Sequence, residues 1–262
     1  TAGFLILLFV MSKTRQKVVV GMSGGVDSSV AAALLVEQGY EVIGAFMKNW
    51  SDTKDIKGEC AWKAERRDAM SVAGKLNIPF VTFDFERDYK ENVVGYMFRE
   101  YEAGRTPNPD VMCNSFIKFP LFWAEAKKLG ADFIATGHYA RTDKSKILLS
   151  EDPDKDQTYF LQRINKEDLE HTLFPVGHLK KPAVRELARE FGLATAEKKD
   201  STGICFIGEI NIREFLKKYI PVKPGKVLTT SGKVVGDHEG LNFFTVGQRE
   251  GLGIGGGIPY YV

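Results

Sequence analysis

The sequence has little cysteine and little net charge. Its 262 residues include three cysteines, and Lys and Arg together exceed Asp and Glu by only two. No CxxC pair is present and no cysteine has the His/Cys spacing of a zinc site, so neither a zinc site nor a disulfide framework is indicated. We therefore expect a reducing compartment. Because the charge is nearly balanced, composition alone does not indicate a nucleic-acid partner.

Long apolar runs are also missing. The first ten residues, TAGFLILLFV, contain a run of seven apolar residues, which is too short to span a bilayer and lacks a basic leader. We interpret residues 1–10 as a read-through or other non-native extension before Met11, with a short anchor as the alternative. No other segment approaches transmembrane length and no targeting peptide is recognisable, so we expect a cytoplasmic protein with no membrane partner.

Strand-like and helix-like segments alternate through most of the chain. The segments with strand character are residues 17–22, 41–47, 78–85 and 131–139. The segments with helical spacing are residues 28–40, 61–77 and 89–104. This alternation predicts an α/β fold with a doubly wound, mainly parallel sheet. Pro120 interrupts a further helical pattern, where we expect a kink or a helix start.

The pattern of predicted helices and strands changes at about residue 209. A helical stretch at 211–219 is followed by two short β-like runs around a Ser-Gly turn. We predict a catalytic domain over residues 11–208 and a small, incomplete second domain over residues 209–262.

The stretch GMSGGVDSSV, residues 21–30, is the first motif that indicates chemistry. A Walker A loop needs GxxxxGK[ST] and a dinucleotide fingerprint needs GxGxxG, and both patterns fail here. What remains is a tight Ser-Gly-Gly turn between a strand and a helix, whose first N–H groups favour an anion. Asp27 could bind Mg²⁺ or cap the helix. The alternative is a capped glycine-rich turn with no ligand.

A second polar loop follows the strand predicted at 131–139, where Thr136, Gly137 and His138 stand together. Ligands in doubly wound sheets bind beyond the carboxyl ends of the strands, so we expect both loops to face one pocket.

Two of the cysteines lie in polar surroundings. Cys113 ends the stretch GRTPNPDVMCN, whose prolines and asparagines predict an irregular loop, with Asp110 three residues before the thiol. Cys205 lies in KKDSTGICFIGE, where nearby lysines would lower the thiol pKa. Cys60, in KGECAWKAE, is interpreted as structural or incidental.

SGGVDS resembles the signature of the PP-loop ATP pyrophosphatases, which cleave ATP between the α and β phosphates. The longer pattern resembles the family of tRNA-specific 2-thiouridylases. The segments that carry this resemblance run in the family's order over nearly all of residues 17–257. They are GMSGGVDSS, GAFMKNW, GRTPNPDVMCN, IATGHYAR, KDQTYFL, LFPVGHLKKPAVR, KKDSTGICFIGE and TVGQREGLGIGG.

The resemblance implies a role for each matching position. The residues implied to bind ATP are Gly21, Met22, Ser23, Gly24, Gly25, Val26, Asp27 and Ser28, with Met47 and Gly137 bordering the adenine and ribose. Those implied to meet the target base are Asn108, Pro109 and Asp110, and those implied to contact tRNA are His138, Lys155, Asp156 and Gln157. Cys205 would carry a persulfide, Cys113 would be its nucleophilic partner, and the two would form a disulfide.

The family's reaction requires ATP, Mg²⁺ and a tRNA with a wobble uridine. It also requires a persulfide sulfur donor, either a cysteine desulfurase or a relay protein. Asp110 would serve as general base or orient the ring nitrogen. The resemblance implies that family members continue into a C-terminal β-barrel, and we expect this chain to stop before it.

Several alternatives remain open. The chain could be another PP-loop adenylating ligase, or a truncated ATP-binding module without turnover. His138 could be a strand-end histidine with its hydrogen bonds satisfied, and Asp156 a helix cap. Lys180, Lys181 and Arg185 read as an ordinary basic helix start unless tRNA lies there.

Overall fold

A computed structural model describes residues 15–51, 60–143, 145–200, 212–255, 257 and 259–262. Its centre is a five-stranded sheet in which every neighbouring pair of strands is parallel. The strand order is β3 (Phe80–Asp84), β2 (Glu41–Lys48), β1 (Lys17–Gly21), β4 (Phe133–Ala135) and β7 (Thr172–Leu173). The predicted doubly wound α/β fold is confirmed. The interpretation of residues 1–10 lies outside the described residues.

The middle strand, β1, explains why the sheet is buried on both faces. Its sequence KVVVG places Val18, Val19 and Val20 at 0% exposure. Continuous β-branched residues are typical of a parallel strand covered on both sides. Val19 packs into one side-chain cluster, whereas Val18 and Val20 pack into the other.

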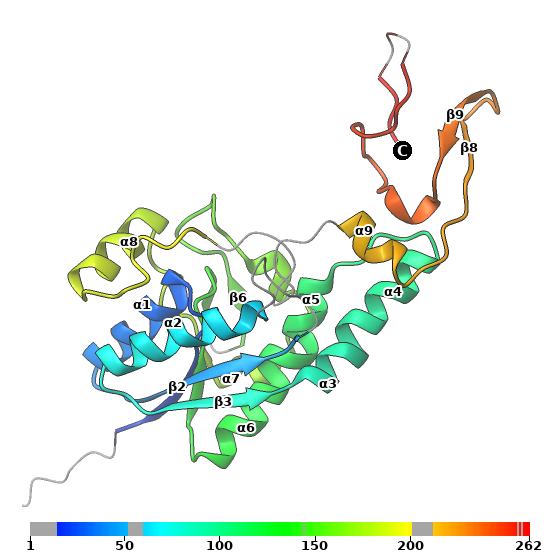
Figure 1. The fold of residues 1–262 in the computed structure, drawn as a ribbon. Helices are drawn as coiled ribbons and strands as arrows, with labels where there is room; N and C mark the ends of the chain where they lie inside the picture. Colours follow the sequence, from blue (N-terminus) through cyan, green and yellow to red (C-terminus); the bar gives the residue numbers. More distant parts are fainter. Residues whose placement is uncertain (1–14, 52–59, 144, 201–211, 256, 258) are drawn as a thin grey trace, which may run out of the picture.

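Helices cover both faces of the sheet (Figure 1). One face is covered by α1 (Val26–Glu37), α2 (Ala61–Lys75) and α8 (Lys181–Glu190). The other is covered by two longer helical runs and by α7 (Lys166–Glu170). The first run joins α3 (Glu86–Tyr89), the π-helical η1 (Lys90–Val94) and α4 (Gly95–Glu102). The second joins α5 (Pro109–Cys113), the π-helical η2 (Asn114–Leu121) and α6 (Phe122–Lys128).

Two predictions for residues 104–128 need correction. The irregular loop predicted around Cys113 is wrong, because residues 109–113 form the helix α5. Asn108 caps this helix and Pro109 occupies its first turn, so the residues read as breakers start a helix instead. The helix does not start at Pro120, which lies inside η2. There the wider π-helical turn accommodates the residue that has no N–H.

The strand order reverses at β1, because β2 lies on one side of it and β4 on the other. In doubly wound sheets the crevice at such a reversal, outside the carboxyl ends of the strands, is where ligands bind. The loops after β1 and β4 both open there. A short hairpin follows β4, formed by β5 (Arg141–Thr142) and β6 (Ile147–Leu148), and leads to the turn η3 (Thr158–Leu161).

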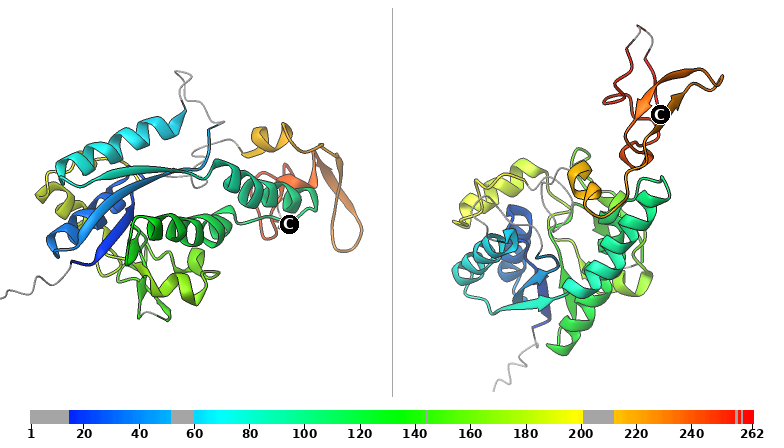
Figure 2. Two further views of the ribbon diagram at one scale, coloured as in Figure 1. Left: turned by 90° about the horizontal axis from the view of Figure 1, so that it is seen from below. Right: turned by 45° about the vertical axis from the view of Figure 1, so that its right-hand side comes forward.

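The predicted small second unit is present after the sheet-containing part, and its predicted boundary at residue 209 lies outside the described residues. The unit contains α9 (Ile212–Lys217), the antiparallel pair β8 (Gly225–Leu228) and β9 (Val234–His238), and the turn η4 (Leu241–Phe243). Figures 1 and 2 show that it projects from the sheet-containing part, with α9 next to α4. Phe98 of α4 stacks on Phe215 and Tyr219 at ring-centroid distances of 5.8 and 4.9 Å. No helix in the described ranges is long and apolar enough to cross a membrane.

Candidate functional site

The loop between β1 and α1 is held by its own backbone and serines. The Met22 amide donates to the Ala45 carbonyl at 2.8 Å, and the Ser23 amide donates to Ser28 Oγ at 3.1 Å. Gly25 is the N-cap of α1 and supplies no side chain to cap it. No described side chain caps the first turn of this 12-residue helix, a position that favours an anion, and the predicted binding of phosphate there stays a prediction.

The side chains of this loop divide between core and site. Met22 and Val26 are buried in the core, so only their backbone can meet a ligand. Gly24 has a φ of +76°, and a Cβ there would lie 2.3 Å from the Glu65 carbonyl oxygen of α2. A glycine is required at this position for both reasons.

The loop after β4 lies directly against the first turn of α1, and the pocket predicted between the two loops stays a prediction. A Cβ on Gly137 would lie 2.5 Å from the Ser28 nitrogen. Met47, predicted to border the adenine, is buried, and its Cε lies 3.0 Å from where a Cβ of Gly21 would be. The glycine loop, Met47 and Gly137 are therefore brought to one edge of the sheet.

His138 is 9% exposed and packs between the rings of Phe119 and Phe174. Its Nδ1 lies 2.8 Å from Thr136 Oγ1. Burial, and then the nearby charge of Lys118, hold the pKa of His138 well below its usual value, so the ring is neutral. This arrangement matches the alternative of a satisfied strand-end histidine, and its contact with tRNA stays a prediction.

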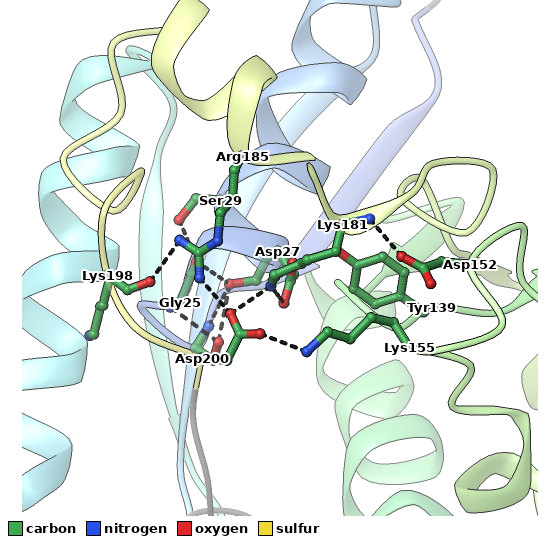
Figure 3. Close-up of polar contacts among 12 residues, drawn as sticks. Gly25, Asp27, Ser29, Tyr139, Asp152, Lys155, Lys181, Arg185, Lys198 and Asp200 are labelled. Carbon is green, nitrogen blue, oxygen red and sulfur yellow. Dashed lines mark hydrogen bonds and ion pairs between the residues drawn. The ribbon is translucent and has the colours of Figure 1, made fainter. Parts of the chain in front are cut away.

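Asp27 is bound by a lysine from a distant helix (Figure 3). Lys181 Nζ, from the start of α8, lies 2.7 and 2.9 Å from the two carboxylate oxygens of Asp27. The Tyr139 hydroxyl donates to Asp27 Oδ1 at 2.8 Å. Burial and the neighbouring Asp27 carboxylate raise the pKa of Tyr139, which keeps the phenol protonated as a donor.

Asp200 joins the same cluster. Its carboxylate lies 2.8 Å from Lys181 Nζ, 2.8 Å from Lys155 Nζ and 2.7 Å from an Arg185 guanidinium nitrogen. Although burial opposes it, the hydrogen bonds from Lys155 and Lys181 lower the pKa of Asp200 from 3.8 to about 2. We call these five residues the ion cluster: Asp27, Lys155, Lys181, Arg185 and Asp200.

Sequence reasoning missed how the ion cluster is assembled. Lys181 was interpreted as part of an ordinary basic helix start, beside Lys180. The structure separates the two lysines, because Lys180 is exposed at the N-cap whereas Lys181 is buried. One feature of the sequence could have indicated this contact. The helix dipole disfavours the positive charge of a lysine in the first turn, so such a lysine favours an anionic partner.

Asp156 and Gln157, which follow Lys155 in the KDQ motif, accept hydrogen bonds from nearby backbone amides. Asp156 accepts from the amides of Ser150 and Thr158 at 2.7 and 3.1 Å, whereas the N-cap of η3 is Gln157, which makes no side-chain cap. Gln157 Oε1 accepts from the Tyr139 amide at 3.0 Å. The alternative of Asp156 as a helix N-cap is therefore wrong, because Gln157 occupies that position, and contacts of the motif with tRNA stay predictions.

Cys113 is the last residue of α5 and is fully buried. Asn108 Oδ1 accepts from the Val111 amide at 3.1 Å, and Asp110 lies half-buried in the first turn. Cys113 belongs to the large core cluster on one face of the sheet, which also contains Met47. In the described part of the chain Cys113 and Cys60 are thiols. The predicted disulfide partner, Cys205, lies outside the described residues.

Two buried amide side chains lie near these elements with polar atoms unpaired among the described residues. Asn49 follows β2, is 1% exposed, and has neither side-chain amide atom hydrogen-bonded. Asn114 follows Cys113; its Nδ2 donates to the Phe160 carbonyl but its Oδ1 is unpaired. Buried groups of this kind are usually satisfied by a ligand or a water, so the edge fits a polar ligand such as a nucleotide.

The residues at this edge of the sheet fit a metal ion less well than a nucleotide. The described residues contain no group of three or more His, Cys, Asp and Glu side chains placed to hold a metal. Lys181 contacts both oxygens of Asp27, the predicted Mg²⁺ ligand. An ion bound through the protein at Asp27 would therefore have to displace that ammonium.

Two family models match the chain. One, described as the tRNA methyl transferase HUP domain, matches residues 16–209, and the tRNA methyl transferase PRC-barrel domain matches residues 213–262. The curated relatives carry another name, tRNA-specific 2-thiouridylase MnmA. The protein of Bacillus cytotoxicus is 56% identical over 95% of this chain and 68% of its own length. That of Lysinibacillus sphaericus is 55% identical over 96% and 70%.

The solved structures that resemble this chain share less of its sequence. The NMN synthetase of Francisella tularensis is 20% identical, with a TM-score of 0.46, over 71% of this chain and 66% of that one. A 4-thiouridine synthetase in complex with RNA and ATP is 16% identical, with a TM-score of 0.46, over 79% and 50%.

Proposed function

The chain belongs to the tRNA-specific 2-thiouridylase family, and we propose from this premise that it is a sulfurtransferase that replaces the C2 oxygen of a tRNA wobble uridine with sulfur, using ATP. The observation that carries the proposal is the joint placement of two functional parts. The start of α1 has no side-chain cap and suits phosphate, while the thiol of Cys113 packs in the same core cluster as Met47, a neighbour of Gly21. A nucleotide-binding module alone would not need that thiol.

In the first step the uridine C2 oxygen attacks the α phosphorus of ATP. The bond from that phosphorus to the β-phosphate bridging oxygen breaks, and pyrophosphate leaves. The N-terminus of α1 and the loop residues 21–28 bind the phosphates. Met47 and Gly137 border the adenine and ribose, and Mg²⁺ brought in with ATP would supply charge neutralisation at the phosphates. Adenylation is needed because oxide is a poor leaving group whereas AMP is a good one.

In the second step the terminal sulfur of a Cys205 persulfide attacks C2, and AMP leaves with the former uridine oxygen. The Cys113 thiolate then attacks Sγ of Cys205. A Cys113–Cys205 disulfide forms, the sulfur–sulfur bond of the persulfide breaks, and the sulfur stays on the uridine. A thiol reductant restores both cysteines, and a cysteine desulfurase or relay protein supplies the next persulfide sulfur.

The remaining predicted residues position the tRNA. Asn108, Pro109 and Asp110 precede Cys113 by three to five residues, at the start of α5, so they are close enough to hold the target base beside the thiol. Asp110 serves as general base or orients the ring nitrogen. Lys155, Asp156, Gln157 and His138 contact the tRNA. Since the substrate is tRNA, the cytoplasm is the expected compartment.

The test incubates the chain with ATP, Mg²⁺, a cysteine desulfurase with cysteine, and unmodified tRNA bearing a wobble uridine. Thiolated tRNA is scored by its retarded migration in a mercury-containing gel. We expect thiolation by the parent, and loss of it in Cys113→Ser and in Cys205→Ser.

Cys60→Ser is the matched control. Cys60 is the N-cap of α2, where serine is a favourable residue, so this variant keeps its fold and its thiolation. Pyrophosphate release with unchanged turnover in both other cysteine variants would favour a different PP-loop ligase. ATP binding without pyrophosphate release in the presence of tRNA would favour an inactive nucleotide-binding module.

A further inference from the structure

Lys181 occupies an unusual position for a lysine. It is the first residue of α8, and its side chain is only 11% exposed. The dipole of α8 opposes a positive charge at this end of the helix, and burial adds a desolvation penalty. Both costs are offset by the carboxylates that its ammonium contacts, so the position of Lys181 is determined by Asp27 and Asp200.

The hydrogen-bond geometry uses the whole ammonium group. Lys181 Nζ lies 2.7 Å from Asp27 Oδ1, 2.9 Å from Asp27 Oδ2 and 2.8 Å from Asp200 Oδ1. An ammonium has three donors, and three carboxylate oxygens surround this one. The three oxygens take all three donors, so none is left for a phosphate while the ion cluster is intact (Figure 3).

Asp27 places a negative charge close to the proposed phosphate site, and a lysine ammonium neutralises that charge. Asp27 lies in the first turn of α1, beside the N–H groups that are left uncapped at Gly25. An unpaired carboxylate there would repel a triphosphate, and could also turn toward the N–H groups and occupy them. Lys181 cancels the charge, and together with the hydroxyl of Tyr139 it fixes the direction of the carboxylate.

We propose that Lys181 is a positioning residue for ATP, which neutralises Asp27 and keeps its carboxylate from competing with phosphate at the start of α1. The proposal rests on the proposed use of ATP. It also accounts for how this loop binds phosphate without the lysine of a Walker A motif. The lysine is supplied by α8 and acts on the loop's own aspartate rather than on the ligand.

The experiment measures the dissociation constant for ATP with Mg²⁺ by calorimetry in five proteins. They are the parent, Lys181→Met, Lys180→Met, Asp27→Asn and the double variant Asp27→Asn/Lys181→Met. Lys180→Met is the matched control, because it removes the same charge from the adjacent, exposed residue.

We expect Lys181→Met to weaken ATP binding by about tenfold or more, and Lys180→Met to bind within about twofold of the parent. On the Asp27→Asn background Lys181 has no carboxylate at position 27 to neutralise, so the double variant should bind ATP with the affinity of Asp27→Asn within about twofold. A residue with a merely structural role would lower the melting temperature but would not be compensated in this way.

Two results would overturn the proposal. One is unchanged ATP binding by Lys181→Met. The other is an equal loss on the Asp27→Asn background, which would mean that the lysine contacts phosphate directly. If Lys181→Met does not fold, the comparison of Asp27→Asn with Asp27→Asn/Lys181→Met decides. The double variant leaves no unpaired carboxylate at position 27. A parent chain that fails to bind ATP would overturn the proposed function as well, whereas normal ATP binding and thiolation by Lys181→Met would overturn only this inference.

Discussion

Gly137 abuts the backbone of Ser28 so closely that no side chain fits between them. A Cβ at residue 137 would lie 2.5 Å from the Ser28 nitrogen and 2.7 Å from the Asp27 carbonyl carbon. Both neighbouring atoms belong to backbone in the first turn of α1, which cannot yield as a flexible side chain would. The loop after β4 therefore fixes the position of the helix start that is proposed to bind phosphate.

Substitution of Gly137 by alanine should push this loop away from α1. We expect ATP affinity to fall by about tenfold or more, because displacements of even 1 Å matter at such sites. Gly74→Ala in α2 is the matched control: a Cβ there meets nothing within 4 Å. It should bind ATP normally and gain up to about 1 kcal/mol in stability. Equal ATP affinity in the two variants would contradict the assignment of this edge of the sheet.

Loss of the N-cap of α5 should lower the thiolation rate, whereas its cost in stability should equal that of losing a similar cap elsewhere. Asn108 caps α5 and Asn165 caps α7 by the same hydrogen bond, to the amide three residues on, and both helices have five residues. Replacing either by alanine should cost about 1 kcal/mol in unfolding experiments. Only Asn108→Ala should lower the thiolation rate, because α5 carries Cys113.

A third variant separates the two roles of Asn108. Aspartate also caps helices, so Asn108→Asp keeps α5 in place. Recovered thiolation would assign the effect to the cap, and a persistent loss would assign it to contact with the target base. Equal thiolation by Asn108→Ala and Asn165→Ala would argue that the position of Cys113 is unimportant.

The ion cluster should contribute to stability in a pH-dependent way through Asp200. Its pKa is lowered in the folded protein from 3.8 to about 2, so the stabilisation is fully present above about pH 4. It is lost as the pH falls toward 2. Since the carboxylate is one-third exposed, solvent screening reduces the contribution to on the order of 1 kcal/mol.

Urea unfolding of the parent and of Asp200→Asn at several pH values checks this. The difference in unfolding free energy should be constant near neutral pH and shrink between about pH 4 and pH 2. Glu37→Gln removes a carboxylate from an exposed position of α1 and serves as the control. A difference for Asp200→Asn that does not change across this range would contradict the role of its ionised form.

The stacking of Phe98 on α9 should anchor the small unit. The ring packs on Phe215 and Tyr219, and the Thr106 hydroxyl donates to Thr245 Oγ1 at 3.0 Å near the same contact. We expect Phe98→Ala to accelerate tryptic cleavage after Lys217 and Lys218 by several-fold while ATP affinity is unchanged. Phe116→Ala, at an exposed position of η2, is the control. Unchanged cleavage of Phe98→Ala would mean that other contacts anchor the unit.

Local patterns predicted the elements well where burial on both faces or a helical period dominated. The valines of β1, the helix after the glycine loop and the β8–β9 hairpin are confirmed. Boundaries moved by a few residues; for example, α1 begins at Val26 rather than at residue 28. The error at α5 has a clear physical cause. Asn and Pro favour both irregular loops and helix starts, and only the packing of Met112 and Cys113 into the core decided between them.

The sequence by itself determined the family, the fold class and the glycine loop, because these depend on residue order and on short-range periodicity. It could not determine which side chains meet across long separations. Lys181 and Asp27 are 154 residues apart, and Asp200 joins them from a third segment. Only the reversal of strand order at β1, together with the packing of α8 beside α1, brings these charges together. The tertiary structure therefore decided that an ordinary-looking lysine is buried at the start of the helix that is proposed to bind ATP.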